Sequence, residues 1–248
     1  MKKYELTTET LQFAGRTLHR IKAVKDFGSI KAGEFGGWIE NEKNLSQDDN
    51  AWIYGDAMVF DNAKIFGNAE VYDNAKIFGN AKTFGHANVS GNAKVYGNAN
   101  VFGYSNVSDY AKVYGNANVS VYANVFGYAN VSGNANVFGH ANVSDNAEVY
   151  GNANVSDYAK VYGNATIKGD AKVHDAVDYI VFKNFWSSGR YFTWTRSNNK
   201  WSVGCFYGTG EELIKKAYAD SGKSGREYER VVRYVESILA DEKKEKSN

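Results

Sequence analysis

The stretch AWIYGD-AMVFDN-AKIFGN-AEVYDN-AKIFGN, residues 51–80, opens a run of six-residue repeats that continues without insertion or deletion to Ala176. The run contains 21 hexads of the form Ala-x-Val-x-Gly-Asn. The small residue is replaced only by Ser105, and the branched aliphatic residue two positions later is replaced only by Thr83. A fixed short period of this kind is typical of a solenoid.

The pattern within a hexad predicts one short strand and one corner. Ala and Val lie two positions apart, so their side chains point to the same side of a strand, and the residue between them points to the other side. Most hexads end in Gly or Asp followed by Asn, Tyr or His. Gly, Asn and Asp tolerate the positive φ that a sharp corner needs. The period alone leaves open how many corners close one coil.

The pattern V-Y-G-N-A-K resembles the hexapeptide repeat of the left-handed parallel β-helix superfamily, in which three hexads close a triangular coil of 18 residues. This resemblance covers about half of the chain. It implies an all-β solenoid of about seven coils, about 34 Å long at roughly 4.8 Å per coil.

With an 18-residue coil, residues 18 apart stack into columns on the outside of the solenoid. One corner then carries six asparagines, expected to join side-chain amides along the axis: Asn62, Asn80, Asn98, Asn116, Asn134 and Asn152. Another corner becomes a row of rings formed by His86, Tyr104, Tyr122, His140 and Tyr158. These rings either stack only on one another or form a contact surface for a second copy or a ligand. The superfamily commonly forms trimers through prism faces, so the resemblance implies a homo-oligomer.

Four segments follow from the boundaries of the repeat. Residues 1–50 are expected to form an N-terminal β cap, with a hairpin near residues 13–16 and two degenerate hexads, IENEKN and LSQDDN, as a first coil. Residues 51–176 form the solenoid. Residues 177–240 are expected to form a β-β-β-α-α module from the strands YIVFKNFW, RYFTWTR and KWSVGCFY and two helices that begin with capping boxes at Thr209 and Ser224. We expect residues 241–248 to form a solvated tail.

The C-terminal module contains a second set of candidate binding residues. Alternation in RYFTWTR places Arg190, Trp194 and Arg196 on one side of a strand, and Trp201 lies in the next strand. Arginines interleaved with aromatic rings can hold phosphates and stack on bases. The same pattern also describes a small sheet that packs on helices, with arginine stems covering its rim.

The sequence gives little indication of catalysis. Many proteins of the superfamily are acyltransferases that use coenzyme A or acyl-carrier protein, with a histidine general base, so the resemblance makes His86 or His140 the alternative base and coenzyme A the alternative cofactor. No loop interrupts the 21 hexads, and neither a Ser/His/Asp arrangement nor a set of metal ligands is visible in the sequence. The hypothesis from the residues is therefore a non-catalytic protein without cofactor or metal.

The amino-acid composition limits the classes of partner and the cellular compartment that we expect for this protein. The 29 basic and 28 acidic side chains are nearly balanced, which argues against a general nucleic-acid surface. The single Cys205 excludes an internal disulfide framework, and MKKYELTTET has no apolar core of a secretion signal. No stretch approaches the length of a membrane span. We therefore expect a cytoplasmic protein.

Nearly the whole chain resembles uncharacterised hexapeptide-repeat proteins of bacteria and their prophages, which carry an entry segment similar to KDFGSIKAGEFGGWIENEKNLSQDDNAWIYGDA and in some cases a tail like FWSSGRYFTWTR. This resemblance implies no established activity. The sequence predicts a scaffold in which a rigid solenoid presents a C-terminal binding module. A host protein or a small ligand as the partner of this module is what the resemblance alone implies.

Overall fold

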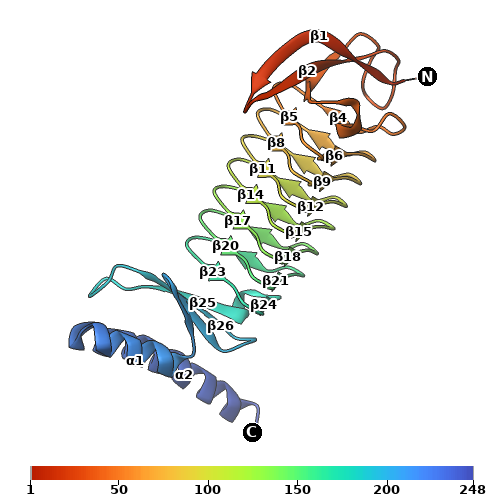
Figure 1. The fold of residues 1–248 in the computed structure, drawn as a ribbon. Helices are drawn as coiled ribbons and strands as arrows, with labels where there is room; N and C mark the ends of the chain where they lie inside the picture. Colours follow the sequence, from red (N-terminus) through yellow and green to blue (C-terminus); the bar gives the residue numbers. More distant parts are fainter. Residues whose placement is uncertain (1, 248) are drawn as a thin grey trace.

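The computed structural model describes residues 2–247, and its central feature is a parallel β-solenoid (Figure 1). Each of the 21 hexads forms one two-residue strand, and each strand pairs in parallel with strands 18 residues away; Val89, for example, pairs with Val71 and Val107. Three strands make one coil. The predicted all-β solenoid with 18-residue coils is confirmed.

The strands form three flat faces, which we name by their side chains. The lysine face consists of β5 (Met58–Val59), β8 (Lys76–Ile77), β11 (Lys94–Val95), β14 (Lys112–Val113), β17 (Asn130–Val131), β20 (Glu148–Val149) and β23 (Thr166–Ile167). The serine face consists of β4 (Trp52–Ile53), β7 (Glu70–Val71), β10 (Asn88–Val89), β13 (Asn106–Val107), β16 (Asn124–Val125), β19 (Asn142–Val143) and β22 (Lys160–Val161). The phenylalanine face consists of β6 (Lys64–Ile65), β9 (Lys82–Thr83), β12 (Asn100–Val101), β15 (Asn118–Val119), β18 (Asn136–Val137), β21 (Asn154–Val155) and β24 (Lys172–Val173).

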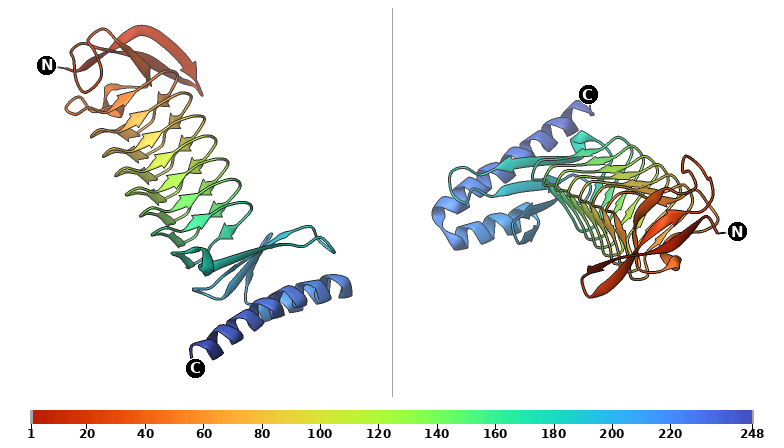
Figure 2. Two further views of the ribbon diagram at one scale, coloured as in Figure 1. Left: turned by 180° about the vertical axis from the view of Figure 1, so that it is seen from behind. Right: turned by 90° about the horizontal axis from the view of Figure 1, so that it is seen from above.

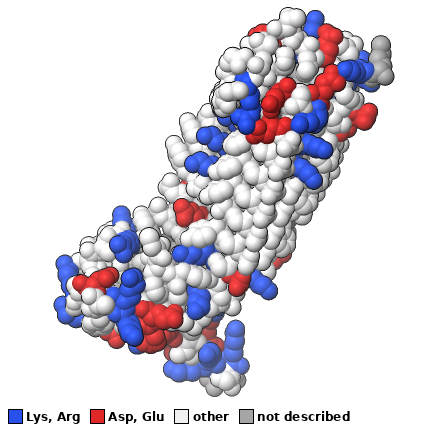
Figure 3. Space-filling view, viewed as in Figure 1, with Lys and Arg blue, Asp and Glu red and all other residues white. Residues whose placement is uncertain are grey.

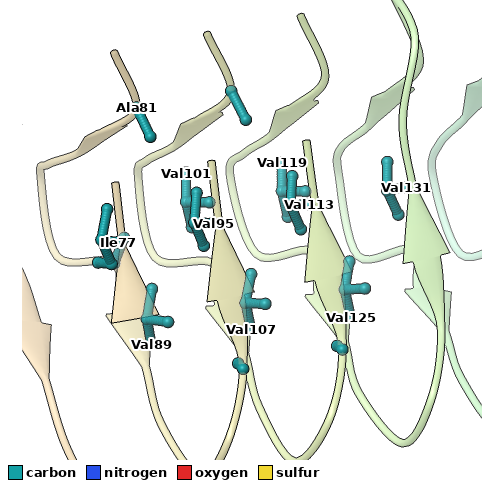
Figure 4. Packing of buried hydrophobic residues seen from close by; sticks show 14 of the residues in the cluster. Ile77, Ala81, Val89, Val95, Val101, Val107, Val113, Val119, Val125 and Val131 are labelled. Atoms are coloured by element: carbon teal, nitrogen blue, oxygen red, sulfur yellow. The ribbon is translucent and has the colours of Figure 1, made fainter. Parts of the chain in front are cut away.

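The core of the solenoid is the column of Ala and branched aliphatic side chains inside the triangle (Figure 4). Val95, Val107 and Val119 have no accessible surface, and neither do the alanines of the repeat. Burial of one such valine side chain contributes about 1.5–3 kcal/mol, and neighbouring coils share the contact. Ala and Val of each hexad thus point to the same side of the strand, as predicted, and this side is the interior of the solenoid.

The N-terminal cap extends the sheet of the lysine face. The antiparallel hairpin of β1 (Tyr4–Phe13) and β2 (Arg16–Ala23) turns at Ala14–Gly15, both with positive φ, and β2 pairs with β3 (Phe35–Ile39). Strand β3 then pairs in parallel with β5, which adds an eighth turn to the seven regular coils. The predicted hairpin near residues 13–16 is confirmed.

The degenerate hexads at residues 39–50 form the expected first coil, but shifted by two positions. Ile39 pairs with Val59 and Leu45 with Ile65, a separation of 20 residues instead of 18. These large side chains therefore occupy the aliphatic position and not the alanine position, and the short helix η1 (Glu42–Asn44) lies between them. Trp52 packs against the rings of Tyr4 and Phe27, at centroid distances of 6.2 and 5.4 Å, and so connects the cap to the first strand of the serine face.

The C-terminal module contains one strand more than predicted. After the short helix η2 (Ala176–Asp178), β25 (Tyr179–Lys183), β26 (Tyr191–Thr195), β27 (Lys200–Val203) and β28 (Phe206–Gly208) form an antiparallel sheet. The segment KWSVGCFY, predicted as one strand, forms the two strands β27 and β28. They are joined by a tight turn at Gly204, which adopts a φ of 54°.

Two helices, α1 (Gly210–Asp220) and α2 (Gly222–Glu245), cover one side of this sheet (Figure 2). The Thr209 capping box of α1 is confirmed, because Thr209 accepts a hydrogen bond from the Glu212 N–H. The predicted cap at Ser224 is wrong: Ser221 is the N-cap of α2 and accepts from the Ser224 N–H. Helix α2 also continues to Glu245, so the first residues of the predicted tail are helical. No helix within residues 2–247 is long and apolar enough to cross a membrane.

The module docks on the last coil through side chains that bond to the free edge of the coil. Thr193 Oγ1 accepts from the Thr166 N–H at 2.9 Å, and Ser197 Oγ accepts from the Lys172 N–H at 2.7 Å. The Tyr207 hydroxyl donates to the Lys168 carbonyl at 3.0 Å. Because an open strand edge can recruit other strands, these bonds also close the solenoid at this end. The N-terminal cap and the module thus lie at opposite ends (Figures 1 and 2).

Candidate binding surfaces

The predicted row of rings at the corner between the phenylalanine and serine faces is confirmed, and we call it the histidine corner. Its members are His86, Tyr104, Tyr122, His140 and Tyr158. Successive ring centroids lie 4.6, 5.2, 4.9 and 5.1 Å apart, and neighbouring planes differ by at most 12°. The spacing follows from the coil repeat, since parallel strands lie about 4.8 Å apart. The result is a rigid edge of half-exposed rings along five coils.

The asparagine corner is also confirmed. Each side-chain amide donates to the carbonyl oxygen of the asparagine 18 residues later, from Asn62 to Asn80 at 3.2 Å and then at 3.0 Å down to Asn152. Two further amide ladders, which we did not predict, run along the faces; they include Asn106 to Asn124 at 2.9 Å and Asn118 to Asn136 at 3.1 Å. They could have been found with the same 18-residue register.

Stacking limits the chemistry of the two histidines. The faces of the His140 ring are covered by Tyr122 and Tyr158, and the ring of His86 is covered on one face by Tyr104. Within residues 2–247, neither imidazole forms a hydrogen bond or ion pair with a carboxylate; His86 Nε2 lies 3.4 Å from the amide nitrogen of Asn68. A general base is usually oriented by a partner on its second ring nitrogen, so this geometry favours a stacking role.

A groove of about 390 Å³ lies beside His140, where the histidine corner meets the C-terminal end of the solenoid. Its volume is within the range of small-molecule sites. The wall contains titratable groups on both sides, from the corner and from the segment before η2. The lining residues are His140, Asn142, Tyr158, Lys160, Asp175 and Ala176.

The structure does not place the candidate residues of the module on a free surface. Trp194 and Trp201 are 1% and 2% exposed in the core between the sheet and the helices, which is the packing alternative of the sequence analysis. Arg196 donates two hydrogen bonds to the Glu242 carboxylate of α2, at 2.7 and 3.0 Å. This contact raises the pKa of Arg196 and lowers that of Glu242. Of the four residues, only Arg190 remains exposed, so the predicted arginine–aromatic surface is wrong.

A Ser–His–Asp cluster that the sequence analysis missed lies on the last two coils. His174 Nδ1 lies 2.6 Å from Ser156 Oγ and 3.1 Å from Asp157 Oδ2. In a catalytic triad the serine and the carboxylate contact different ring nitrogens, whereas here both contact Nδ1. Ser156 is also 1% exposed. The cluster therefore fixes the last coil and has no nucleophile accessible to a substrate. Among residues 2–247, no group of three or more His, Cys, Asp or Glu side chains has the arrangement of a metal site.

The middle of the solenoid carries no charged side chain. Residues 113–144, which we call the uncharged belt, contain no Asp, Glu, Lys or Arg. The charged residues gather toward the two ends and leave the middle of the visible surface bare (Figure 3). The belt nevertheless exposes large apolar side chains, among them Val121, Tyr122, Phe126, Tyr128 and Phe138. Depletion of charge together with exposed aromatic rings is the composition of an interface core.

Comparison with known proteins gives one partial relationship. No family model matches the chain. A segment of 62 residues is 39% identical to the uncharacterized acetyltransferase YdcK of Escherichia coli (strain K12), and the match covers 22% of this chain and 19% of that protein. The chain thus spans about a fifth of the length of this relative. The match agrees with a hexapeptide-repeat solenoid.

Proposed function

We propose that this chain is a non-catalytic binding scaffold that associates with further copies of itself through the uncharged belt. The observation that supports the proposal is the absence of charge over residues 113–144 next to exposed aromatic rings. A charged side chain must lose water when it enters an interface, so a surface without charge costs less to cover. The stacked rings are already ordered, so their entropy loss on binding is small.

The contact that we propose centres on the serine face in one coil. Tyr122 and Tyr128 form the two corners of this face, and Phe126 lies between them; they are 46%, 60% and 37% exposed. Asn106, Asn124 and Asn142 extend the patch as a flat amide ladder. A flat face with aromatic corners is suited to another prism with the same 18-residue repeat, and a trimer is the form that the superfamily resemblance implies.

Sedimentation velocity tests this proposal on the full chain. We expect the wild-type protein to sediment as an oligomer at about 10 µM, which corresponds to an ordinary micromolar or tighter association. Phe126→Lys combined with Tyr128→Lys should produce a monomer, because two charges would be buried without partners. Tyr234→Lys, which changes a tyrosine of α2 that is 56% exposed, is the matched control and should leave the oligomer intact. A wild-type monomer over this concentration range would contradict the proposal.

A second candidate is acyl transfer from coenzyme A with His140 as the general base. It is favoured by the groove beside His140 and by the partial match to a protein named as an acetyltransferase. Calorimetric titration with coenzyme A is the direct test. Saturable binding that is lost in His140→Ala but kept in His86→Ala would favour this candidate over the scaffold, and absence of binding would exclude it.

The proposal also covers the cellular compartment of the protein and the partners that it binds besides further copies of itself. The one thiol, Cys205, is exposed and unpaired, which suits a reducing compartment such as the cytoplasm. With the belt occupied by further copies, both ends of each solenoid stay accessible for a host protein or a small ligand. Affinity capture from a bacterial lysate, with the Phe126→Lys/Tyr128→Lys variant as a second bait, would separate partners of the ends from partners of the belt.

A further inference from the structure

A hollow of about 350 Å³ lies at the N-terminal end of the lysine face, beneath the turn of the β1–β2 hairpin. We call it the hairpin hollow. Its apolar wall is formed by Phe13 from β1 and by Phe60 and Phe78 from the lysine face. The Phe13 and Phe60 ring centroids lie 5.7 Å apart, and Phe60 and Phe78 are stacked at 5.0 Å. The hollow is therefore a preformed site at the junction of two structural units, where small-molecule sites are common.

The polar side of the hollow carries two lysines without an acidic partner. Lys76 and Lys94 line it, and within residues 2–247 neither of them forms an ion pair. Lys76 Nζ donates only to the Asn74 carbonyl at 3.2 Å and lies 5.7 Å from the Phe13 ring centroid. Lys112 continues the column in the next coil, since Lys94 pairs with both Lys76 and Lys112.

The one acidic residue that lines the hollow is already neutralised. Asp61 accepts a hydrogen bond from Arg16 Nε at 2.7 Å and another from the Gly79 N–H at 3.1 Å. The Arg16 guanidinium also lies over the Phe60 ring, 5.3 Å from its centroid. Arg16 thus pairs with Asp61 and also lies 4.0 Å from Glu40, a carboxylate outside the lining, while Lys76 and Lys94 keep the hollow itself net positive.

Stacked lysines repel one another at this position, whereas the serine face avoids such repulsion. The equivalent outward position on the serine face carries asparagines that bond to one another, such as Asn88 and Asn106 at 3.2 Å. Like charges directly opposite each other on parallel strands repel. Burial and the neighbouring Lys94 charge lower the pKa of Lys76. An anion between the two ammonium groups would relieve this repulsion.

We propose that the hairpin hollow binds a small organic anion with an aromatic or aliphatic body. The body would contact the rings of Phe13, Phe60 and Phe78, and the anionic group would pair with Lys76 and Lys94. The volume accommodates one small ligand. The site is separate from the uncharged belt, so the inference does not depend on the proposed self-association.

The test compares two probes of the same shape on the full chain. We expect 2-naphthalenesulfonate to bind by calorimetry at least about tenfold more tightly than the neutral 2-naphthalenemethanol, and its affinity to fall with added salt because the ion pairs are screened. Nuclear magnetic resonance should show an upward shift of the Lys76 pKa on binding of the sulfonate. Equal affinity for the two probes, or no saturable binding up to about 10 mM, would overturn the proposal.

Matched variants locate the site. Lys76→Gln with Lys94→Gln should weaken sulfonate binding at least about tenfold and leave the weak binding of the alcohol unchanged. Lys64→Gln with Lys82→Gln is the control, since these lysines stack in the same way on the phenylalanine face. An equal loss in both double variants would show non-specific attraction to lysine columns and would refute the site. The comparison of the two probes on wild-type protein stands even where a variant folds poorly.

Discussion

Two residues depart from the hexad in ways that carry a local cost. Thr83 occupies the inward aliphatic position between Ile65 and Val101, and its buried hydroxyl has no hydrogen-bond partner. Val121 occupies a corner position that is otherwise Gly or Asp, and its φ of 66° lies in the left-handed region. A β-branched side chain is rarely found there because of the steric clash with the backbone. Both sites predict stabilising substitutions.

Thr83→Val should raise the free energy of unfolding by about 1–2 kcal/mol, because it removes a buried unsatisfied hydroxyl and keeps the shape of the side chain. Chemical denaturation measures the change. Ser105→Ala is the matched control: the Ser105 hydroxyl donates to the Phe102 carbonyl at 2.8 Å, so its removal should give no gain. An equal gain in the free energy of unfolding for both variants would show that the unsatisfied hydroxyl of Thr83 is not the source of the gain.

Val121→Asp should stabilise the single chain by about 1 kcal/mol, and the effect is measured in the Phe126→Lys/Tyr128→Lys variant because Val121 also belongs to the uncharged belt. At the equivalent corner Asp109 adopts a φ of 59° and accepts a hydrogen bond from the Gly127 N–H, 18 residues later, at 3.0 Å. An aspartate at 121 would face Gly139 in the same way. Val24→Asp changes an exposed valine outside the left-handed region and should shift the thermal midpoint little. A lower midpoint for Val121→Asp would show that Val121 gains more from its neighbours than it loses in backbone strain.

At the scale of elements, regular hexads were predictable and their exceptions were not. The strands and ring columns follow from the hexad period and the 18-residue register, so His86 and Tyr104 stack as the sequence indicates. The two-residue shift at Ile39 could not be predicted from the sequence, because a large apolar side chain fits either the alanine or the aliphatic position of a hexad. The buried state of Trp194 and Trp201 depends on helices whose docking no local pattern specifies, and the Arg196–Glu242 contact joins residues 46 positions apart.

The attachment of the module to the last coil predicts a local effect. In Thr193→Val with Ser197→Ala, the Thr166 and Lys172 N–H groups lose their acceptors, and each unpaired group costs about 1–3 kcal/mol. We expect faster hydrogen exchange at these two amides. Thr195→Val removes a bond inside the module, from Thr195 Oγ1 to Asn198 at 2.6 Å, and should leave both amides protected. Unchanged exchange in the double variant would show that other contacts hold the module.

At the scale of the whole molecule, the inward positions of the hexads are nearly uniform, whereas the outward positions differ from one face to the next. The inward Ala and Val are nearly the same in every hexad, so any hexad can stack on any other without a cavity. Each outward column of rings or amides joins residues that lie 18 positions apart on the same face or corner. Solenoid stability is close to a sum over neighbouring repeats. The inward side chains therefore determine the solenoid fold, and the outward side chains determine which residues stack on one another along each face.

Deleting whole hexads separates these two contributions. Removal of residues 87–104, one complete coil, keeps every column in register, and we expect a cooperative transition with a slightly lower midpoint. Removal of residues 87–98, two hexads, preserves the interior but moves every downstream strand to the next face, so Phe102 would no longer lie over Phe84. Although the shorter deletion removes fewer residues, it should have the lower thermal midpoint by calorimetry. A higher midpoint for the two-hexad deletion would mean that the outward columns contribute little and that the core alone determines stability.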